Sequence, residues 1–412
     1  MSIFKNKHYI EAVGYSIFFY AALSFATTFY AIWLSSKINL TASQTGFVYA
    51  VNAFVALFFM IIYGLGQDRL GLKKFLLWIQ SIFILGCGPF FIYVYEPLLN
   101  SSFYTGTLLG AVYLSIAFFS GMGLIDSYVD RLSRIYHFEF GSARMGGSLS
   151  AAIVAFIAGR FIAIDPHINF WCISLSGFAL ICLNMIYKVD LSLKYEKEVE
   201  KLTLKEQLSI FSQRRFWFFV IYVFGTYSLY NVYDQQLFPV FYTHQFEDIK
   251  VGYKLYGYLG SLQVFIEAGM MCTAPFLVNR LGAKYSLVLA AFLSALRIIL
   301  SGYFTSIVLI SCMKLFHAFE ISIILVSAFK YISLNFDRRF SASVFLIGFQ
   351  IAGSVGVISL SSFIGIVYDK YGYQFSFYIL GAVVLAFMVF AMFFLKNDTH
   401  LIAERGLRKT IH

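Results

Sequence analysis

Eight ionisable side chains fall inside long apolar stretches of the sequence. They are Asp126, Arg144, Asp234, Glu267, Arg297, Lys314, His317 and Glu320. A charge at the centre of a lipid bilayer costs about 2.5–3.5 kcal/mol on insertion scales, so such a residue usually has a partner or a function. With His317 neutral, four of these groups are carboxylates and three are fixed cations, which leaves one carboxylate in excess. An unpaired buried carboxyl group tends to hold a proton, as a proton carrier must.

Three of these residues, Lys314, His317 and Glu320, follow one another at intervals of three. On a helix this spacing places them along one stripe, on successive turns. His317 can pass or orient a hydrogen bond near neutral pH, and an approaching Arg297 would destabilise protonated Glu320. Asp234 and Lys314 look like a matched structural ion pair between two helices. Structural pairing is also the alternative for the other charges, and a buried core histidine is the alternative for His317.

The composition indicates what must position these groups. Of 412 residues, 60% are hydrophobic and 13% are charged, whereas soluble domains have about 25% charged residues. Lipid must therefore form part of the solvent, and a helix that crosses it needs about 20 mostly apolar residues. Twelve stretches qualify, at roughly 10–35, 46–66, 75–95, 104–130, 144–163, 168–188, 216–242, 255–278, 285–304, 306–335, 343–367 and 374–395. They are too long for the strands of about 10 residues in a membrane barrel.

The chain is organised as two halves. Its longest polar stretch, roughly 189–215, has six apolar runs before it and six after it. The sequence therefore predicts an N-terminal six-helix bundle at 1–188, a cytoplasmic linker at 189–215, and a C-terminal six-helix bundle with a short tail at 216–412.

A repeated motif supports this division. After the second run the motif residues are Gly64, Asp68, Arg69, Gly71, Lys73 and Lys74, and an echo follows the eighth run as Asn279-Arg280-Leu-Gly282-Ala-Lys284. Glycines allow helices to approach closely, and Asp68 with the basic residues can bridge loop and helix ends at a gate. A simple positively charged anchor is the alternative.

The positions of Lys and Arg predict the orientation. Of the 31 such residues, 24 are assigned to the side of both termini and 5 to the other side, and Arg297 and Lys314 are assigned to neither. Positive loops face the cytoplasm, so both termini are expected there, in a bacterial inner membrane. These positively charged loops account for the net positive charge of the chain, so the charge does not indicate a nucleic-acid partner. Five scattered cysteines indicate no disulfide framework, and the first helix is expected to be retained rather than cleaved.

An enzyme is the least favoured class, because the sequence has no nucleophile–base set, metal-ligand cluster or phosphate loop. No cofactor or metal is expected. The mixture of acid, amide and aromatic residues at Tyr230-Asn231-Val-Tyr233-Asp234-Gln235-Gln236 is typical of a sugar site.

With these features the chain resembles the oligosaccharide:proton symporters of the major facilitator superfamily along nearly its whole length. The resemblance rests on Ile32–Leu34, Gly64–Lys74, Phe138–Arg144, Asp234–Gln236, Arg297–Ile299 and Lys314–Glu320. It implies an all-α membrane fold of twelve helices in two six-helix bundles. It also implies a sugar-binding pair at Asp126 and Arg144, a helix–helix ion pair at Asp234 and Lys314, and a proton-coupling group, namely Tyr230, Arg297, His317 and Glu320.

Within the family, the chain is most similar to the sucrose-transporting members. This closer likeness rests on the segments 93–99, 167–171, 235–239 and 345–350. Lactose-transporting members carry a sugar-binding acid at the position of Val264, whereas this chain has Glu267 one turn further along the same face. A lactose-type charge pair is replaced by Asn231 and Gly353, and a stacking tryptophan is replaced by Ala151. These departures argue for a different sugar.

The resulting expectation is a monomeric secondary transporter that takes up sucrose or a similar disaccharide together with a proton. Asp126, Arg144, Glu267, Asn231 and Gln350 are expected to bind sugar hydroxyls. Open alternatives are another oligosaccharide of raffinose, lactose or maltose type, an uncoupled facilitator, and a sugar sensor that binds without transport.

Overall fold

The computed structural model describes residues 6–70, 73–187, 209–337 and 340–397, and these residues form helices and short connections without any strand. They belong to two compact units. Unit 1 comprises residues 1–197 and 239–261, and unit 2 comprises residues 198–238 and 262–412. Most of the predicted linker lies outside the described residues. The expected all-helical fold is confirmed for the part of the chain that the structure covers.

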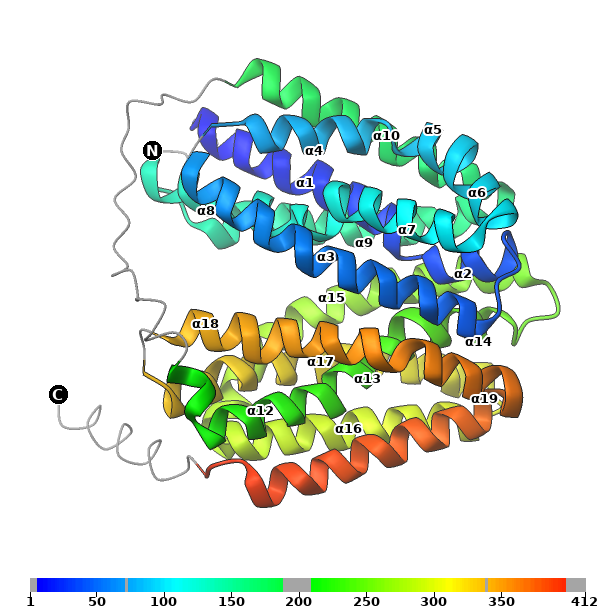
Figure 1. The fold of residues 1–412 in the computed structure, drawn as a ribbon, viewed down its shortest axis with the longest axis vertical. Coiled ribbons are helices and arrows are strands. Elements are labelled where there is room, and N and C mark those ends of the chain that lie inside the picture. Colours follow the sequence, from blue (N-terminus) through cyan, green and yellow to red (C-terminus); the bar gives the residue numbers. More distant parts are fainter. Residues whose placement is uncertain (1–5, 71–72, 188–208, 338–339, 398–412) are drawn as a thin grey trace. The chain divides into compact units, whose positions relative to one another are not determined.

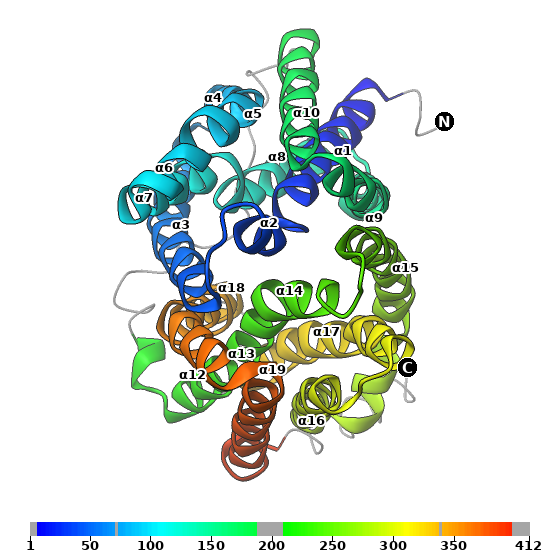
Figure 2. The ribbon, with the colours of Figure 1, turned by 90° about the vertical axis from the view of Figure 1, so that its right-hand side faces the viewer.

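Unit 1 is arranged around its first helix. Its elements are α1 (Lys7–Thr27), α2 (Tyr30–Ser36), α3 (Ala42–Leu70), α4 (Phe75–Leu85), α5 (Cys87–Phe90), η2 (Phe91–Tyr95), α6 (Glu96–Ser101), α7 (Phe103–Leu114), η3 (Ser115–Phe119), α8 (Gly121–Ile135), α9 (Phe140–Ile164), α10 (Pro166–Ile186) and most of α14 (Phe238–Thr243). Helix α1 packs against α8, α9 and α10 (Figures 1 and 2). It can therefore carry side chains toward several neighbours at once.

Unit 2 contains the later helices. Its elements are η4 (Ile210–Ser212), α12 (Arg214–Gly225), α13 (Tyr227–Val232), η5 (Tyr233–Leu237), α16 (Ala283–Tyr303), α17 (Ile307–Asn335), α18 (Ser341–Phe345), η7 (Leu346–Ile351) and α19 (Ala352–Phe394), and α15 (Ile249–Leu281) begins in unit 1 and continues into it. Helix α16 packs against both α17 and α19, and α19 also contacts α12 and α13.

The apolar runs of the sequence correspond to helices, but the number of candidate membrane spans among the described helices differs from the number of predicted runs. Nine described helices are long and apolar enough to cross a membrane, or ten if the pair Phe75–Leu85 and Cys87–Ser101, bent by 50°, is one span. The last two predicted runs are joined in α19, which bends at Gly372 with φ of 80°. The run predicted at 216–242 is divided among α12, α13, η5 and α14. The count of twelve thus stays a prediction.

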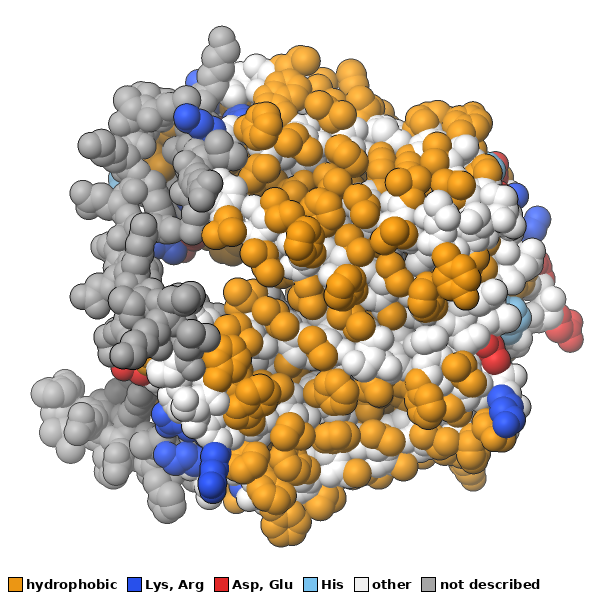
Figure 3. Space-filling model, viewed as in Figure 1, with side chains coloured by type: hydrophobic (Ala, Val, Ile, Leu, Met, Phe, Trp, Pro, Cys, Tyr) orange, Lys and Arg blue, Asp and Glu red, His pale blue; other side chains and the backbone are white. Residues whose placement is uncertain are grey.

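The outward surfaces of the helices are apolar, as lipid requires. Large side chains such as Phe58, Phe276 and Phe393 are 64%, 74% and 78% exposed. Figure 3 shows hydrophobic side chains over the helices of the visible face, whereas the described charged side chains gather near the helix ends. A helix with apolar residues on all sides is expected in a membrane and not in water.

The repeated motif has a structural counterpart in each unit. In unit 1, Arg131 Nη1 on α8 donates to the carbonyl of Gln67 at 3.0 Å. In unit 2, Lys330 Nζ on α17 donates to the carbonyl of Val278 at 3.4 Å. Gln67 directly precedes Asp68 of the motif, and Val278 directly precedes Asn279 of its echo. Both units therefore place a cation against a carbonyl in the last turn of a helix, and in unit 2 the same carbonyl also accepts from Gly282 N at 3.0 Å.

Among the residues that the structure describes, four wide π-helical segments interrupt the α-helices, two in each unit. They are η2 and η3 in unit 1, and η5 and η7 in unit 2. Segments of this kind occur often at functional sites. Two of the sequence-predicted residues lie on them, Asp234 on η5 and Gln350 on η7.

Replacement of Gly177 by alanine should destabilise unit 1. A Cβ at this position of α10 would lie 2.6 Å from the carbonyl carbon of Ile84, in the backbone of α4. Overpacking of this kind costs typically about 1–3 kcal/mol, so the Gly177→Ala protein should melt at a lower temperature in a thermal-shift assay in detergent. Gly269→Ala is the matched control, because a Cβ there meets nothing within 4 Å. Equal melting temperatures for the two variants would contradict the predicted close contact.

Candidate functional site

Six of the predicted residues meet in one buried cluster of unit 2. Tyr230 lies on α13, Asp234 on η5 and Arg297 on α16. Lys314, His317 and Glu320 share the inward face of α17 and are all buried, as their spacing predicts.

Arg297 is at the centre of this cluster, and its side chain is fully buried. Its Nη1 donates to Asp234 Oδ1 at 3.0 Å, and its Nη2 donates to Glu320 Oε1 at 2.6 Å. The guanidinium also lies over the ring of Tyr233, 4.8 Å from the ring centroid. One planar cation thus bridges two carboxylates, a role that suits the fixed fork of arginine.

Asp234 is the second shared member. Besides Arg297, it contacts Lys314 Nζ at 3.3 Å and His317 Nδ1 at 3.1 Å. The hydroxyl of Tyr230 lies 2.8 Å from His317 Nε2. Asp234 and Lys314 are therefore in contact but do not form a separate pair. The same carboxylate joins them to the residues predicted for proton coupling.

The geometry also locates the excess carboxylate. In the cluster, Asp234 and Glu320 balance Arg297 and Lys314, and in unit 1 Asp126 is paired with Arg144. Of the eight intramembrane residues in the charge balance, the excess acid is thus Glu267, half-buried on α15, which forms no ion pair with the described residues. The charge count alone therefore does not single out Glu320.

Glu320 is distinguished by its hydrogen bonds instead. Its Oε2 is buried and has no hydrogen-bond partner within 3.5 Å among the described residues, and the hydroxyl of Ser294 is its neighbour at longer range. A proton on this oxygen would displace no existing hydrogen bond. Arg297 and Lys314 would each keep Asp234 as a partner, so neither buried cation would lose its last carboxylate, an outcome that would be costly.

The predicted pair in unit 1 is more accessible. Arg144 Nε on α9 donates to Asp126 Oδ1 on α8 at 3.0 Å. The two side chains are 25% and 34% exposed. Tyr20 on α1 completes the group, because its hydroxyl lies 2.9 Å from both carboxylate oxygens of Asp126. A charged pair with free surface can offer donors and acceptors to a polar ligand.

The other predicted ligands belong to unit 2. Asn231 is half-buried on α13, and its Oδ1 accepts from Gln235 Nε2 at 3.3 Å. Gln350 is exposed on η7, and Glu267 is half-buried on α15. The structure thus places the predicted ligands on both units.

The motif after the second run is only partly described. Gly64 is exposed and a Cβ there would meet nothing within 4 Å, so its predicted role in close helix approach is wrong in this structure. The side chains of Asp68 and Arg69, and all of Gly71, lie outside the described residues. Lys73 is exposed. Lys74 Nζ bonds to Glu11 Oε1 at 2.7 Å and to the carbonyl of Tyr187 at 2.8 Å.

Glu11 is a buried charge that the sequence analysis missed. It has 0% exposure, and it accepts from Tyr128 at 2.9 Å and contacts His8 Nδ1 at 2.9 Å, in addition to Lys74. Burial lowers the pKa of Lys74, and the contact with Glu11 offsets part of that effect. The available signal was the spacing of His8 and Glu11, three residues apart on one helix face.

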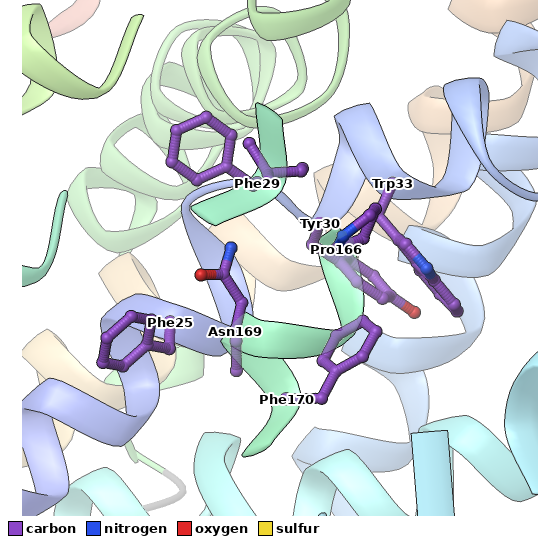
Figure 4. Close-up of a pocket in the computed structure, with 9 residues that line it drawn as sticks. Phe25, Phe29, Tyr30, Trp33, Pro166, Asn169 and Phe170 are labelled. Atoms are coloured by element: carbon purple, nitrogen blue, oxygen red, sulfur yellow. The ribbon is translucent and has the colours of Figure 1, made fainter. Parts of the chain in front are cut away.

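A small aromatic cavity lies elsewhere in unit 1 (Figure 4). Its lining includes Phe29, Tyr30, Trp33, Asn169 and Phe170. None of the predicted ligands lines it.

Comparisons with known proteins agree with these observations. The sequence profile of the LacY proton/sugar symporter family matches residues 1–406. The chain is 44% identical to the sucrose permease of Escherichia coli, over 99% of both chains. It is 36% identical to the lactose permease of Klebsiella oxytoca, over 91% of both. The crystal structure of the nucleoside transporter NupG matches with a TM-score of 0.79 at 14% identity, covering 95% of this chain and 100% of that one, which shows the shared fold.

The shared position of Asp234 leads to a prediction about stability. Asp234→Asn takes one carboxylate from Arg297 and Lys314 together, whereas Lys314→Met leaves Asp234 in contact with Arg297 and His317. Breaking a buried ion pair costs about 3–5 kcal/mol. We therefore expect Asp234→Asn to lower the melting temperature more than Lys314→Met, and the double variant to recover part of the loss. Equal effects of the two single variants would indicate an isolated pair.

Proposed function

Since the chain belongs to the LacY family of proton/sugar symporters, we propose that sucrose is the sugar it takes up together with a proton. The protein is a membrane transporter of the major facilitator fold that couples sugar movement to protons. Identity of 44% to a sucrose permease over the full chain is the observation that carries the choice of sugar. Glu267, Asn231 and Ala151, which depart from the lactose-type pattern, support the same choice.

The proposed sugar site is centred on Asp126 and Arg144. A carboxylate accepts hydrogen bonds from sugar hydroxyls and a guanidinium donates them, and both side chains are partly exposed. Glu267, Asn231 and Gln350 of unit 2 complete the proposed set. In this fold, substrates bind near the middle of the membrane.

Glu320 is the proposed proton carrier, with Arg297, His317 and Tyr230 as the groups that tune it. The support is its buried Oε2 without a partner and the ability of Asp234 to keep both cations paired. Coupling then requires that the sugar bind the protonated protein better, because a ligand shifts an equilibrium only by its differential affinity. Rocking of the predicted bundles, residues 1–188 and 216–412, would expose the site alternately.

The proposed setting is the inner membrane of a bacterium, with both termini in the cytoplasm and the protein acting as a monomer. The distribution of Lys and Arg supports the orientation. The motif at Gly64–Lys74 would lie on the cytoplasmic side and act as a gate. The bond from Lys74 to buried Glu11 gives the end of that motif a fixed attachment to α1.

Sugar-dependent pH changes test the substrate and the coupling together. Cells that express the chain are placed in weakly buffered, anaerobic medium, and sucrose, raffinose or lactose is added in turn. We expect the medium to become alkaline with sucrose and to change least with lactose. A pH change with raffinose alone would show that raffinose, and not sucrose, is the substrate. Downhill sucrose entry without a pH change would indicate an uncoupled facilitator, and sucrose binding without entry would indicate a sensor.

Two glutamate variants separate the proton site from the sugar site. Glu320→Gln cannot release a proton, so it should abolish uphill accumulation of sucrose and spare exchange across proteoliposome membranes. Glu267→Gln, with the same change of charge on the excess carboxylate, should weaken sucrose binding instead. If Glu320→Gln still accumulates sucrose against a gradient, or if only Glu267→Gln loses coupling, the proton assignment is wrong.

A further inference from the structure

We infer that Tyr20 is a positioning residue of the sugar site, which holds Asp126 and Arg144 in one arrangement before the sugar binds. The inference rests on the proposed function, because it assumes that this pair receives the sugar. Neither the charge pattern of the sequence nor the family resemblance pointed to Tyr20. Its role follows from its contacts with the pair.

The hydroxyl of Tyr20 lies within hydrogen-bond distance of both carboxylate oxygens of Asp126. It lies 2.9 Å from Asp126 Oδ1 and 2.9 Å from Oδ2. A donor placed evenly between two acceptor oxygens resists rotation of the carboxylate in either direction. Arg144 Nε binds Oδ1 from another helix, and two contacts from different directions fix the orientation of the group. Such charge-assisted hydrogen bonds are stronger than neutral ones.

The ring of Tyr20 fixes the other member of the pair. The guanidinium carbon of Arg144 lies 3.5 Å from the ring centroid, well within the range of a cation–π contact. Arg144 Nη1 also lies 3.4 Å from Ser148 Oγ, one turn further on α9. The ring below and the two hydrogen bonds at its edge determine the plane of the guanidinium, and with it the directions of the remaining N–H groups.

The backbone makes room for this side chain. A Cβ at Gly147 of α9 would lie 2.7 Å from Tyr20 Cδ2, so the ring occupies space that only a glycine leaves. One turn further along α1, Ser24 Oγ donates to the carbonyl of Ala151 at 3.2 Å. Tyr20 and Ser24 therefore keep the same face of α1 against α9, and the ring has a fixed place.

Tyr20 supports the pair from behind and does not itself provide a surface for the ligand. Its exposure is 6%, whereas the side chains of Asp126 and Arg144 are 34% and 25% exposed. The carboxylate has about four acceptor positions, and Tyr20 and Arg144 occupy only part of them. Because α9 carries Ala151 and no aromatic side chain at that position, the hydrogen bonds of this pair would carry a larger share of the sugar affinity.

The test compares three tyrosine variants of the full chain with sucrose as the probe. Tyr20→Phe keeps the ring and removes the hydroxyl, and Tyr20→Leu removes both. Tyr15→Phe is the matched control, because Tyr15 is buried on the same helix and its hydroxyl donates to Asn184 at 2.6 Å, away from the pair. Binding is measured by calorimetry in detergent, transport in proteoliposomes, and stability by thermal shift.

Losing a pre-ordered arrangement weakens binding without changing the steps that follow it. We expect Tyr20→Phe to raise both Kd and KM for sucrose about five- to tenfold and to leave the maximal rate within about twofold, with a larger rise in Tyr20→Leu. Tyr15→Phe should keep the wild-type Kd. Gly147→Ala keeps the hydroxyl, but its Cβ would lie 2.7 Å from the Tyr20 ring and 3.1 Å from Arg144 Nη1, so it disturbs the ring and the guanidinium together. It should also raise Kd, and Tyr20→Leu is the variant to compare if Tyr20→Phe does not fold.

The other outcomes overturn the inference in distinguishable ways. Unchanged Kd in Tyr20→Phe, while Asp126→Ala loses binding, removes the role of Tyr20 and leaves the proposed sugar site intact. An equal rise in Tyr15→Phe, or a fall in maximal rate at unchanged Kd, indicates a general structural effect. Wild-type protein that binds neither sucrose nor raffinose, or Asp126→Ala that binds normally, refutes the proposed function itself, and the inference with it.

Discussion

The organisation of unit 2 depends on one buried guanidinium. Arg297 comes from α16, and it binds a carboxylate of η5 and a carboxylate of α17 at the same time. A buried arginine is costly unless its charge is paired, and Arg297 is paired through Nη1 and Nη2, while its Nε has no partner among the described residues. Three segments that are distant in the sequence therefore converge on its terminal nitrogens. The wide turn at η5 places Asp234 within reach of Arg297, Lys314 and His317 together. Electrostatics and packing therefore determine the same arrangement of helices.

The two units use charge differently. In unit 2 the ionic cluster is almost completely removed from solvent, and its carboxylate Asp234 is shared between Arg297 and Lys314. In unit 1 the pair of Asp126 and Arg144 keeps part of its surface free, and a buried tyrosine supports it from the rear. A buried cluster can bind a proton but has no room for a larger ligand, whereas a partly exposed pair can bind a ligand with several hydroxyl groups. This contrast supports the proposal that the cluster of unit 2 takes the proton and that Asp126 and Arg144 of unit 1 receive part of the sugar.

Much of this arrangement was predictable from the sequence, because charged residues are rare in membrane-spanning segments and are therefore easy to recognise there. The long apolar runs predicted the helices. The charges within the runs marked Asp126, Arg144 and the residues around Arg297 as candidates for pairing or function. Glu11 was missed because it stands at the start of its run, beside basic residues that resemble an ordinary helix flank. Tyr20 could not be selected, since 29 tyrosines and 48 phenylalanines give no sign of which rings meet a charge. The sharing of Asp234 and the wide turns depend on three-dimensional contacts that no local pattern encodes.

The four π-helical segments have a consequence for how such chains can change over evolutionary time. A wide turn holds one more residue than an α-helical turn, and each residue rotates a helix by about 100°. An insertion or deletion of one codon elsewhere in a spanning helix would turn all the side chains beyond it away from their neighbours. At η5 or η7 the extra residue can be gained or lost within the turn itself. The side chains of both flanking helical segments then still point toward the same neighbours. These segments are thus places where helix length can vary between descendants without dismantling the packed interior.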